Sequence, residues 1–386
     1  MHFQNRWCIF FMIAEELIKY LEDWAPPGAA WSQDNVGLQI GSRKTKIKNV
    51  FLCLELTEEA AEEAVKNHCN FIFTHHPLLF NPLKNLDFQK NSKAKLIEKV
   101  IKNNLVVYSA HTNLDFTKEG VSFELAKVLE LNNIRFLKRE EENQFKLVVF
   151  IPENHVEKIS EAIFEVGGGI IGEYDRCSFR TSGTGTFKGS AKSNPAVGKK
   201  NSFEFVNEVR LEVLVNSWNL KEVLSAMLKV HPYEEPAYDI YPLKNKNSNY
   251  GFGAVGELRK SLSTKEFLSH VCKSLKTENV RYAKGKNGKI KKVAVCGGSG
   301  ADLLSAAIVQ KADAFITADI KYHTFQDGED KILFIDAGHY ETEVLVLNAV
   351  KMKIKKFINK QGESFEIIKF KRSTNPVKFF NNKGVK

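Results

Sequence analysis

Short apolar strands alternate with amphipathic helices in two separate stretches of this chain, and that alternation limits its fold more than any other feature. In the first stretch, VFLCLEL at 50–56, FIFT at 71–74 and LVVYSAH at 105–111 are each followed by a helical pattern. In the second, which begins near residue 250, KKVAVC, DAFITAD and KILFIDAG are followed by helical patterns in the same way. Strands that alternate with helices favour parallel sheets with helices on both faces. The sequence therefore predicts the α/β class.

A different order of elements lies between these two stretches. From about 145 the patterns are strand, helix, strand, a long loop rich in Gly, Ser and Lys, strand, helix and strand. This β-α-β-β-α-β order is typical of ferredoxin-like domains. Because the outer stretches follow the same pattern, one split domain explains them better than two independent ones. We expect 12–143 and 245–372 to be the two halves of one α/β core, 144–244 to be an inserted ferredoxin-like domain, and the last dozen residues to be a loose tail.

The apolar runs and the cysteines bear on membrane insertion and on the cellular compartment. The longest apolar run, Trp7 to Ala14, is far shorter than the ~20 residues that cross a bilayer, and no signal-peptide cleavage pattern follows it. We therefore expect no membrane segment, and residues 1–11 are either a peripheral extension or a misassigned start. The six Cys include no CxxC pair, so neither a zinc knuckle nor a disulfide framework is indicated. A reducing cytoplasm is the expected compartment.

The net charge of +10 raises the question of a nucleic-acid partner. The lysines are scattered, however, and the densest run is KMKIKKF at 351–357. Its apolar residues recur at helical spacing, which favours a helix with a solvated basic face over a nucleic-acid groove. Nucleic acid therefore stays an open but less favoured partner.

Histidines and carboxylates follow the carboxyl ends of three of the apolar strands. They are His75 and His76 after FIFT, His111 and Asp115 after LVVYS, and His339 and Glu343 after KILFID. In open α/β sheets this edge is where ligands bind. A lone histidine at a strand end more often only satisfies a buried hydrogen bond, but the joint pattern favours a site.

The spacing of these residues favours two metal ions over one. Adjacent residues in extended chain point to opposite sides, so His75 and His76 suit different ions. Residues four apart on a helix share a face, so His339 and Glu343 converge, and a carboxylate can bridge two ions. Nitrogen and oxygen ligands without thiolate suit Zn, Mn, Fe, Co or Ni. We predict two divalent ions per chain, held by His75, His76, Asp115, His339 and Glu343.

Other groups each allow two interpretations. His111 and His323 are candidate catalytic residues for proton transfer, although His323 also fits a hydrogen-bonded surface histidine. The CGGSG segment at 296–300 is either a phosphate-binding turn or only a tight turn. Because it lacks the lysine of a P-loop, the tight turn is favoured. Asp34 and Asn35 either shape the rim of the site or only make turns.

Several motifs, taken in order, resemble the NGG-interacting-factor-like family, whose bacterial members are often labelled GTP cyclohydrolase I type 2 homologs. The motifs are WSQDNVGLQIG (31–41), THHPL (74–78), SAHTNLD (109–115), TADIKYH (317–323) and GHYETE (338–343). They cover the outer stretches at about 12–136 and 250–370. The middle stretch is similar to the CutA- and PII-related trimer-forming insert of longer bacterial members. Ser122 and Ala318 stand where the family commonly has Asn and Gly, which concerns the loops near the site and not its ligands.

The resemblance implies a ligand arrangement and an assembly. His75, His76, Asp115, His339 and Glu343 match the family's metal ligands. By that match Glu343 would bridge the ions, with His76 and Asp115 completing one site and His75 and His339 the other. Family members form toroidal hexamers with the metal sites facing an internal cavity, so a homohexamer is expected.

Two functions of different classes follow. The first is a metal-dependent hydrolase of a nucleotide or phosphoester, in which two ions activate water and clamp the substrate. The ring opening of GTP named in the family label is compatible with it. The second is a non-enzymatic metal-handling or scaffold protein that forms a hexameric ring, since the insert adds assembly surface and no evident catalytic residue. An open coordination position would favour the enzyme, and a closed one the scaffold.

Overall fold

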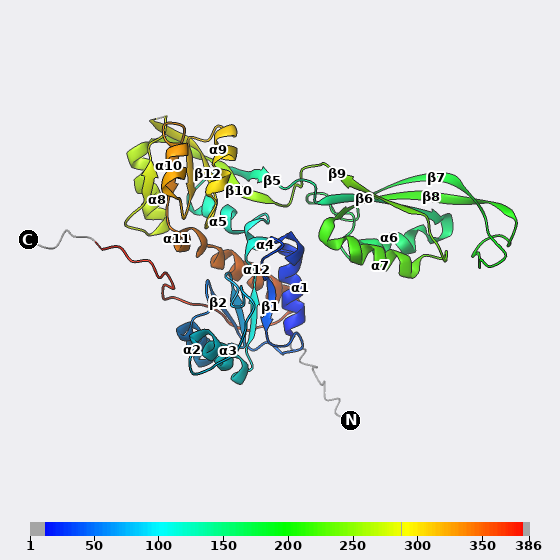
Figure 1. The fold of residues 1–386 in the computed structure, drawn as a ribbon, viewed down its shortest axis with the longest axis horizontal. Helices are drawn as coiled ribbons and strands as arrows, with labels where there is room; N and C mark the ends of the chain where they lie inside the picture. Colours follow the sequence, from blue (N-terminus) through cyan, green and yellow to red (C-terminus); the bar gives the residue numbers. More distant parts are fainter. Residues whose placement is uncertain (1–11, 287, 381–386) are drawn as a thin grey trace, which may run out of the picture. The chain divides into compact units, whose positions relative to one another are not determined.

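The computed structural model describes residues 12–286 and 288–380, so the origin of residues 1–11 lies outside it. The chain divides into two compact units, one formed by the residues up to Lys138 together with those from Gly251, the other by Arg139–Tyr250 (Figure 1). Several sheets and helices alternate, which confirms the predicted α/β class. Within the described ranges no helix is both long and apolar enough to cross a bilayer.

The first sheet of the larger unit has the order β1-β4-β3-β2-β15, parallel except for β1. Its strands are β1 (Gly37–Ile40), β2 (Val50–Cys53), β3 (Phe71–Thr74), β4 (Val106–Ser109) and β15 (Ile367–Lys369). One face packs on α1 (Ala14–Trp24) and α12 (Val346–Gln361), the other on α2 (Glu58–Lys66) and α3 (Ser92–Lys102). Helices on both faces leave every residue of β2, β3 and β4 buried.

The second sheet of the same unit has the order β11-β14-β13-β12-β10-β5, with β12, β13 and β14 parallel. Its strands are β5 (Asn132–Arg139), β10 (Gly251–Ser263), β11 (Arg281–Ala283), β12 (Lys289–Val295), β13 (Ala314–Thr317) and β14 (Leu333–Asp336). Helices α5 (Val121–Val128) and α8 (Thr264–Leu275) cover one face, and α9 (Leu304–Val309) and α10 (Tyr322–Gly328) the other. Two short helices, α4 (Thr112–Asp115) and α11 (His339–Glu343), follow β4 and β14.

The smaller unit is one antiparallel sheet with two helices on a single face (Figure 1). Along the chain its elements are β6 (Gln144–Pro152), α6 (Val156–Glu165), β7 (Ser178–Lys188), β8 (Phe203–Asn216), α7 (Leu220–Val230) and β9 (Tyr238–Leu243). The strand order is β7-β8-β6-β9. The chain enters and leaves this unit at one place, because Glu140 N donates to Tyr250 O and Asn247 N donates to Glu140 O.

Local pattern missed or misplaced several elements. The strands β1, β5 and β11 were not predicted. The helical pattern predicted after KILFIDAG forms two helices, because α11 ends at Glu343 and α12 begins at Val346. Strand β7 runs through TSGTG, predicted as loop, because its pairing with β8 outweighs the weak strand preference of Gly and Ser.

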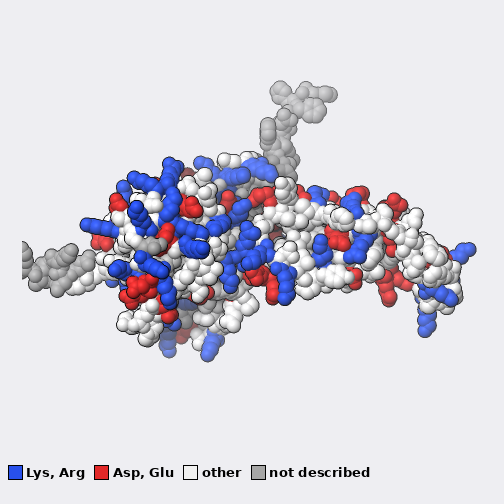
Figure 2. Space-filling view, turned by 90° about the horizontal axis from the view of Figure 1, so that it is seen from above, with Lys and Arg blue, Asp and Glu red and all other residues white. Residues whose placement is uncertain are grey.

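The basic surface is mixed with acidic groups. Figure 2 shows many Lys and Arg side chains on the surface, with Asp and Glu among them. The predicted solvated helix is found: α12 buries Val350, Ile354 and Ile358 while Lys351 and Lys355 are exposed. The KMKIKKF run is therefore explained by the packing of one helix.

Candidate metal centre

The strand β3 delivers His75 and His76 to the centre. FIFT is buried along its whole length, and the chain turns directly after it, because the amides of His75 and His76 both donate to Leu54 O at 3.1 and 2.9 Å. This turn brings the two rings to a centroid distance of 5.0 Å. Adjacent histidines can thus reach a common neighbour from different directions.

The strand β4 and the short helix α4 deliver His111 and Asp115. His111 is the N-cap residue of α4, and Asp115 is its last residue. The carboxylate of Asp34 accepts hydrogen bonds from His111 Nδ1, Thr112 N and Thr112 Oγ1, so the segment around residue 34 fixes the start of this helix. Asp34 is therefore more than a turn residue, since it sets the orientation of the His111 ring.

The second sheet delivers His339 and Glu343 through α11. The two side chains lie on one helix face, as their spacing predicts, and His339 Nε2 is 3.1 Å from Glu343 Oε2. Glu343 is buried, whereas His339 is partly exposed. Ligands from two sheets thus meet inside one unit.

The five predicted ligands converge on the Glu343 carboxylate. Its Oε2 lies 2.9 Å from His76 Nε2, and its Oε1 lies 3.8 Å from His75 Nε2. His75 Nε2 in turn lies 3.6 Å from Asp115 Oδ1. These distances group His75 with Asp115 and His76 with His339, which differs from the pairing that the resemblance implies. Groups able to hold a metal ion are His75, His76 and His111, and His76, His339 and Glu343.

Each of the four histidines has its outer nitrogen held by an oxygen atom, which leaves Nε2 toward the centre. The acceptors of the Nδ1 protons are Ala110 O for His75 at 2.8 Å, Glu55 Oε1 for His76 at 2.9 Å, Asp34 for His111, and Asp319 Oδ2 for His339 at 2.6 Å. Metal-binding histidines almost always show this arrangement, because the outer partner fixes the tautomer and the ring orientation. Glu55 and Asp319 were missed by sequence reasoning, since neither stands in a pattern beside its histidine.

Three polar atoms at the centre fit a cation. His75 Nε2, Asp115 Oδ1 and Glu343 Oε2 are buried, and the groups that lie near them are the other side chains of the centre itself. Buried polar atoms need partners, and their joint occurrence at one point calls for an explanation. Lone pairs of two carboxylates and several imidazoles aimed at a common space suit a divalent cation of borderline character.

The ionisation of the centre favours positive charge. Burial lowers the pKa of His76 and His339, but the carboxylates beside them outweigh burial and raise these pKa values to about 10 and about 9. For Glu343, burial raises the pKa and the histidines outweigh it, so the pKa lies well below the usual range. Burial raises the pKa of Asp115 to about 7. Without a metal ion, protons on the histidines balance the buried carboxylate.

The CGGSG segment at 296–300 forms a tight turn that walls the centre. Its amides are used by protein hydroxyls: Gly297 N donates to Ser122 Oγ, Gly298 N to Thr342 Oγ1 and Gly300 N to Thr317 Oγ1. A phosphate cradle would need these donors, so the tight-turn interpretation is favoured. Gly298 has φ +59°, and a Cβ there would lie 2.1 Å from Glu343 Oε1. A side chain at position 298 would therefore collide with the Glu343 carboxylate, and glycine avoids this collision.

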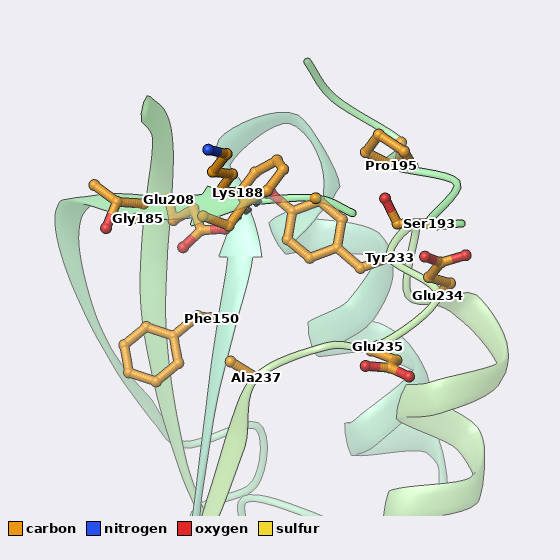
Figure 3. A pocket seen from close by; sticks show the side chains of 14 residues that line it. Phe150, Gly185, Lys188, Ser193, Pro195, Glu208, Tyr233, Glu234, Glu235 and Ala237 are labelled. Carbon is orange, nitrogen blue, oxygen red and sulfur yellow. Dashed lines mark hydrogen bonds between the residues drawn. The ribbon is translucent and has the colours of Figure 1, made fainter. Parts of the chain in front are cut away.

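Other sequence candidates lie elsewhere. His323 is exposed on α10, where Nδ1 pairs with Gln326 Oε1, and it belongs to neither group that could hold a metal ion. Residues 139–250 form a cavity of about 470 Å³ in which Tyr233 donates to Glu208 (Figure 3). His231, beside it, uses both ring nitrogens on backbone groups. This cavity holds none of the predicted ligands.

Two cavities flank the centre. One, of about 380 Å³, includes His76 in its lining, and the other, of about 430 Å³, includes His339. Glu55 lines both. Small molecules therefore have space on either side of the convergent histidines.

A family comparison agrees with the motif pattern. The model of the family described as Duf34/NIF3 (NGG1p interacting factor 3) matches residues 12–376. A protein of Halalkalibacterium halodurans named GTP cyclohydrolase 1 type 2 homolog is 36% identical over 367 residues, which cover 95% of this chain and 98% of that protein. A Bacillus subtilis protein of the same name is 35% identical with the same coverage.

A solved structure agrees with the fold. The crystal structure of a Bacillus cereus protein related to NIF3 is 34% identical in sequence and superposes with a TM-score of 0.79. The match covers 96% of this chain and 100% of that one. Both outer stretches and the middle stretch therefore have counterparts in one relative.

Proposed function

We propose a function for this chain from one premise: it belongs to the Duf34/NIF3 family. The chain binds two divalent metal ions and acts as a metal-dependent hydrolase on a nucleotide or phosphoester. The observation that carries this proposal is the set of four histidines whose outer nitrogens are held, three of which direct their inner nitrogens at buried Glu343. The name shared by the curated relatives, GTP cyclohydrolase 1 type 2 homolog, supports a nucleotide as substrate.

The residues of the centre would divide its work as follows. Glu343 would bridge the ions, with His75 and Asp115 completing one site and His76 and His339 the other. When bound, two divalent ions supply Lewis acidity, which acidifies water and polarises a phosphoryl group or ring. Asp34 would orient His111, whose Nε2 would take or give a proton during the reaction.

Metal analysis and a substrate screen test the proposal together. Purified protein is loaded with Zn²⁺, Mn²⁺, Fe²⁺, Co²⁺ or Ni²⁺ and assayed against nucleotides and phosphoesters, GTP included. About two ions per chain and turnover of at least one compound support a hydrolase. A protein with two ions that is inert toward the whole panel would support the scaffold or metal-handling function instead.

Metal binding is expected to release protons. His76 and His339 carry raised pKa values of about 10 and about 9, so without metal both hold protons at pH 7 that a metal ion must displace. Affinity for Zn²⁺ should therefore fall as pH is lowered through this range. Calorimetry in buffers of different ionisation enthalpy measures the protons released. An affinity independent of pH between 6 and 9 would contradict this charge assignment.

The middle stretch is proposed to be an inserted ferredoxin-like domain, with its bounds at 144–244, that drives assembly. Its strand order and its helices on one face support the ferredoxin-like assignment. It contributes none of the candidate ligands. The homohexamer of the resembling family is the proposed assembly.

Deleting residues 141–249 and joining the ends with a short Gly-Ser linker is expected to leave a folded core that still binds metal. The physical reason is the hydrogen bond between Glu140 and Tyr250, which places the cut ends side by side. Light scattering should show a hexamer for the full chain and a smaller assembly for the deletion variant. A full-length monomer, or an unchanged subunit number after deletion, would refute the assembly role.

A further inference from the structure

The C-terminal segment after β15 makes specific contacts beside the proposed metal centre, although the part of it from residue 375 was predicted to be a loose tail. Phe370 anchors its start: the side chain is buried against Phe51, and Phe370 N donates to Leu52 O. Beyond that point most side chains are exposed, and Thr374 and Asn375 are the two that are partly buried among residues 371–380. This burial marks the place where the segment meets the core.

Thr374 contacts the residue that holds His76. Its hydroxyl donates to Glu55 Oε2, while Glu55 Oε1 accepts the Nδ1 proton of His76 at 2.9 Å. Both carboxylate oxygens of Glu55 are thus used, one on the C-terminal segment and one on a predicted metal ligand. A carboxylate fixed at both oxygens cannot rotate away from the imidazole that it orients.

Asn375 contacts α11, the helix after the second sheet that carries His339 and Glu343. Its Nδ2 donates to Glu341 Oε1 at 2.9 Å, and Glu341 lies on α11 between His339 and Glu343. Its Oδ1 accepts Val377 N, which closes a turn that holds the side chain in place. Two consecutive residues therefore bind two different carboxylates: Glu55, which holds His76, and Glu341, which lies on the helix that carries His339 and Glu343.

We propose that Thr374 and Asn375 form a clip that positions the metal ligands: Thr374 holds Glu55 against His76, and Asn375 ties the segment to α11. This inference rests on the proposed metal centre. The same segment lines the cavity beside His339 through Pro376, Val377 and Phe379, so the clip also fixes one wall of that cavity. Thr374 is a positioning residue that acts through Glu55.

The test measures metal affinity in the full-length chain. Thr374→Val keeps the shape of the side chain and removes the donor, so affinity for the ion that His76 binds should fall measurably, by less than the about 10–100-fold expected from loss of Glu55, the outer partner itself. Thr374→Ser restores the hydroxyl and should restore the affinity. Lys371→Ala, an exposed neighbour in the same segment, is the matched control and should bind as the parent does.

A double-variant cycle separates positioning from general destabilisation. If Thr374 acts through Glu55, adding Thr374→Val to Glu55→Gln should produce no further loss, whereas independent effects would add. The visible absorption spectrum of bound Co²⁺ should change in Thr374→Val and recover in Thr374→Ser, because it reports the geometry of the ligands.

The outcomes separate the two proposals. If the parent protein binds no divalent metal, the proposed function fails. If the parent binds two ions and Thr374→Val has the same affinity and the same Co²⁺ spectrum, the clip is refuted and the metal centre stands. Additive losses in the double variant would also refute action through Glu55.

Discussion

Replacing Glu343 with Gln is expected to remove most of both metal ions from the purified protein, from about two ions per chain toward zero. The change keeps the size of the side chain and removes the negative charge shared by both halves of the centre. Glu343 is buried, with His76 Nε2 2.9 Å from one oxygen and His75 Nε2 3.8 Å from the other. Elemental analysis after dialysis measures the metal content.

Glu341→Gln is the matched control for that experiment. It makes the same chemical change two residues away on α11, and the amide oxygen can still accept from Asn375. Metal content should stay near that of the parent protein. Loss of one ion with full retention of the other in the Glu343 variant would show that this carboxylate belongs to one site and does not bridge.

Replacing His111 with Gln is expected to lower turnover about 10²–10⁴-fold while both ions remain bound. Asp34 holds the ring through Nδ1, so Nε2 is the atom that meets the centre. The burial of Asp34 raises its pKa, but His111 and Thr112 outweigh this and lower it to about 2, so the supporting carboxylate stays charged. Turnover of the active compound from the substrate screen and metal content are measured on the same sample.

His111 has two possible roles, metal ligand or proton-transfer group, and the variant distinguishes them. His111 lies with His75 and His76 in one group that could hold an ion. Metal loss equal to that of Asp115→Asn would make His111 a ligand and overturn the proton-transfer role. Asp34→Asn should reproduce part of the loss of turnover, because it weakens the orientation of the same ring.

The strand-end pattern was informative because parallel strands all place their carboxyl ends at one edge. Strands β3, β4 and β14 were predicted from apolar runs, and the residues that follow them do meet. The i, i+4 spacing of His339 and Glu343 also gave the right helix face. The family assignment, made on these motifs, is confirmed by the comparisons.

What local sequence missed was set by contacts between distant segments. Glu55 follows β2 and reaches His76 after the neighbouring parallel strand β3, and Asp319 follows β13 and reaches His339 after β14. Neither pair therefore has a characteristic spacing in the sequence. The grouping of His76 with His339 depends on how the two sheets approach each other, which periodicity does not encode. Strand β5 was missed because only its pairing beside β10 makes it a strand.

The return of the chain's last segments to its first sheet has a consequence for how the protein is made. Translation delivers His75, His76 and Asp115 early, whereas Glu343 follows only after residues 139–250 have been synthesised. Strand β15, which pairs with β2, and the contact of Thr374 with Glu55 come later still. A nascent chain would thus carry the imidazoles of His75 and His76 before Glu343 is synthesised, so the proposed metal centre would be complete only after the segment that carries Glu343 has been translated.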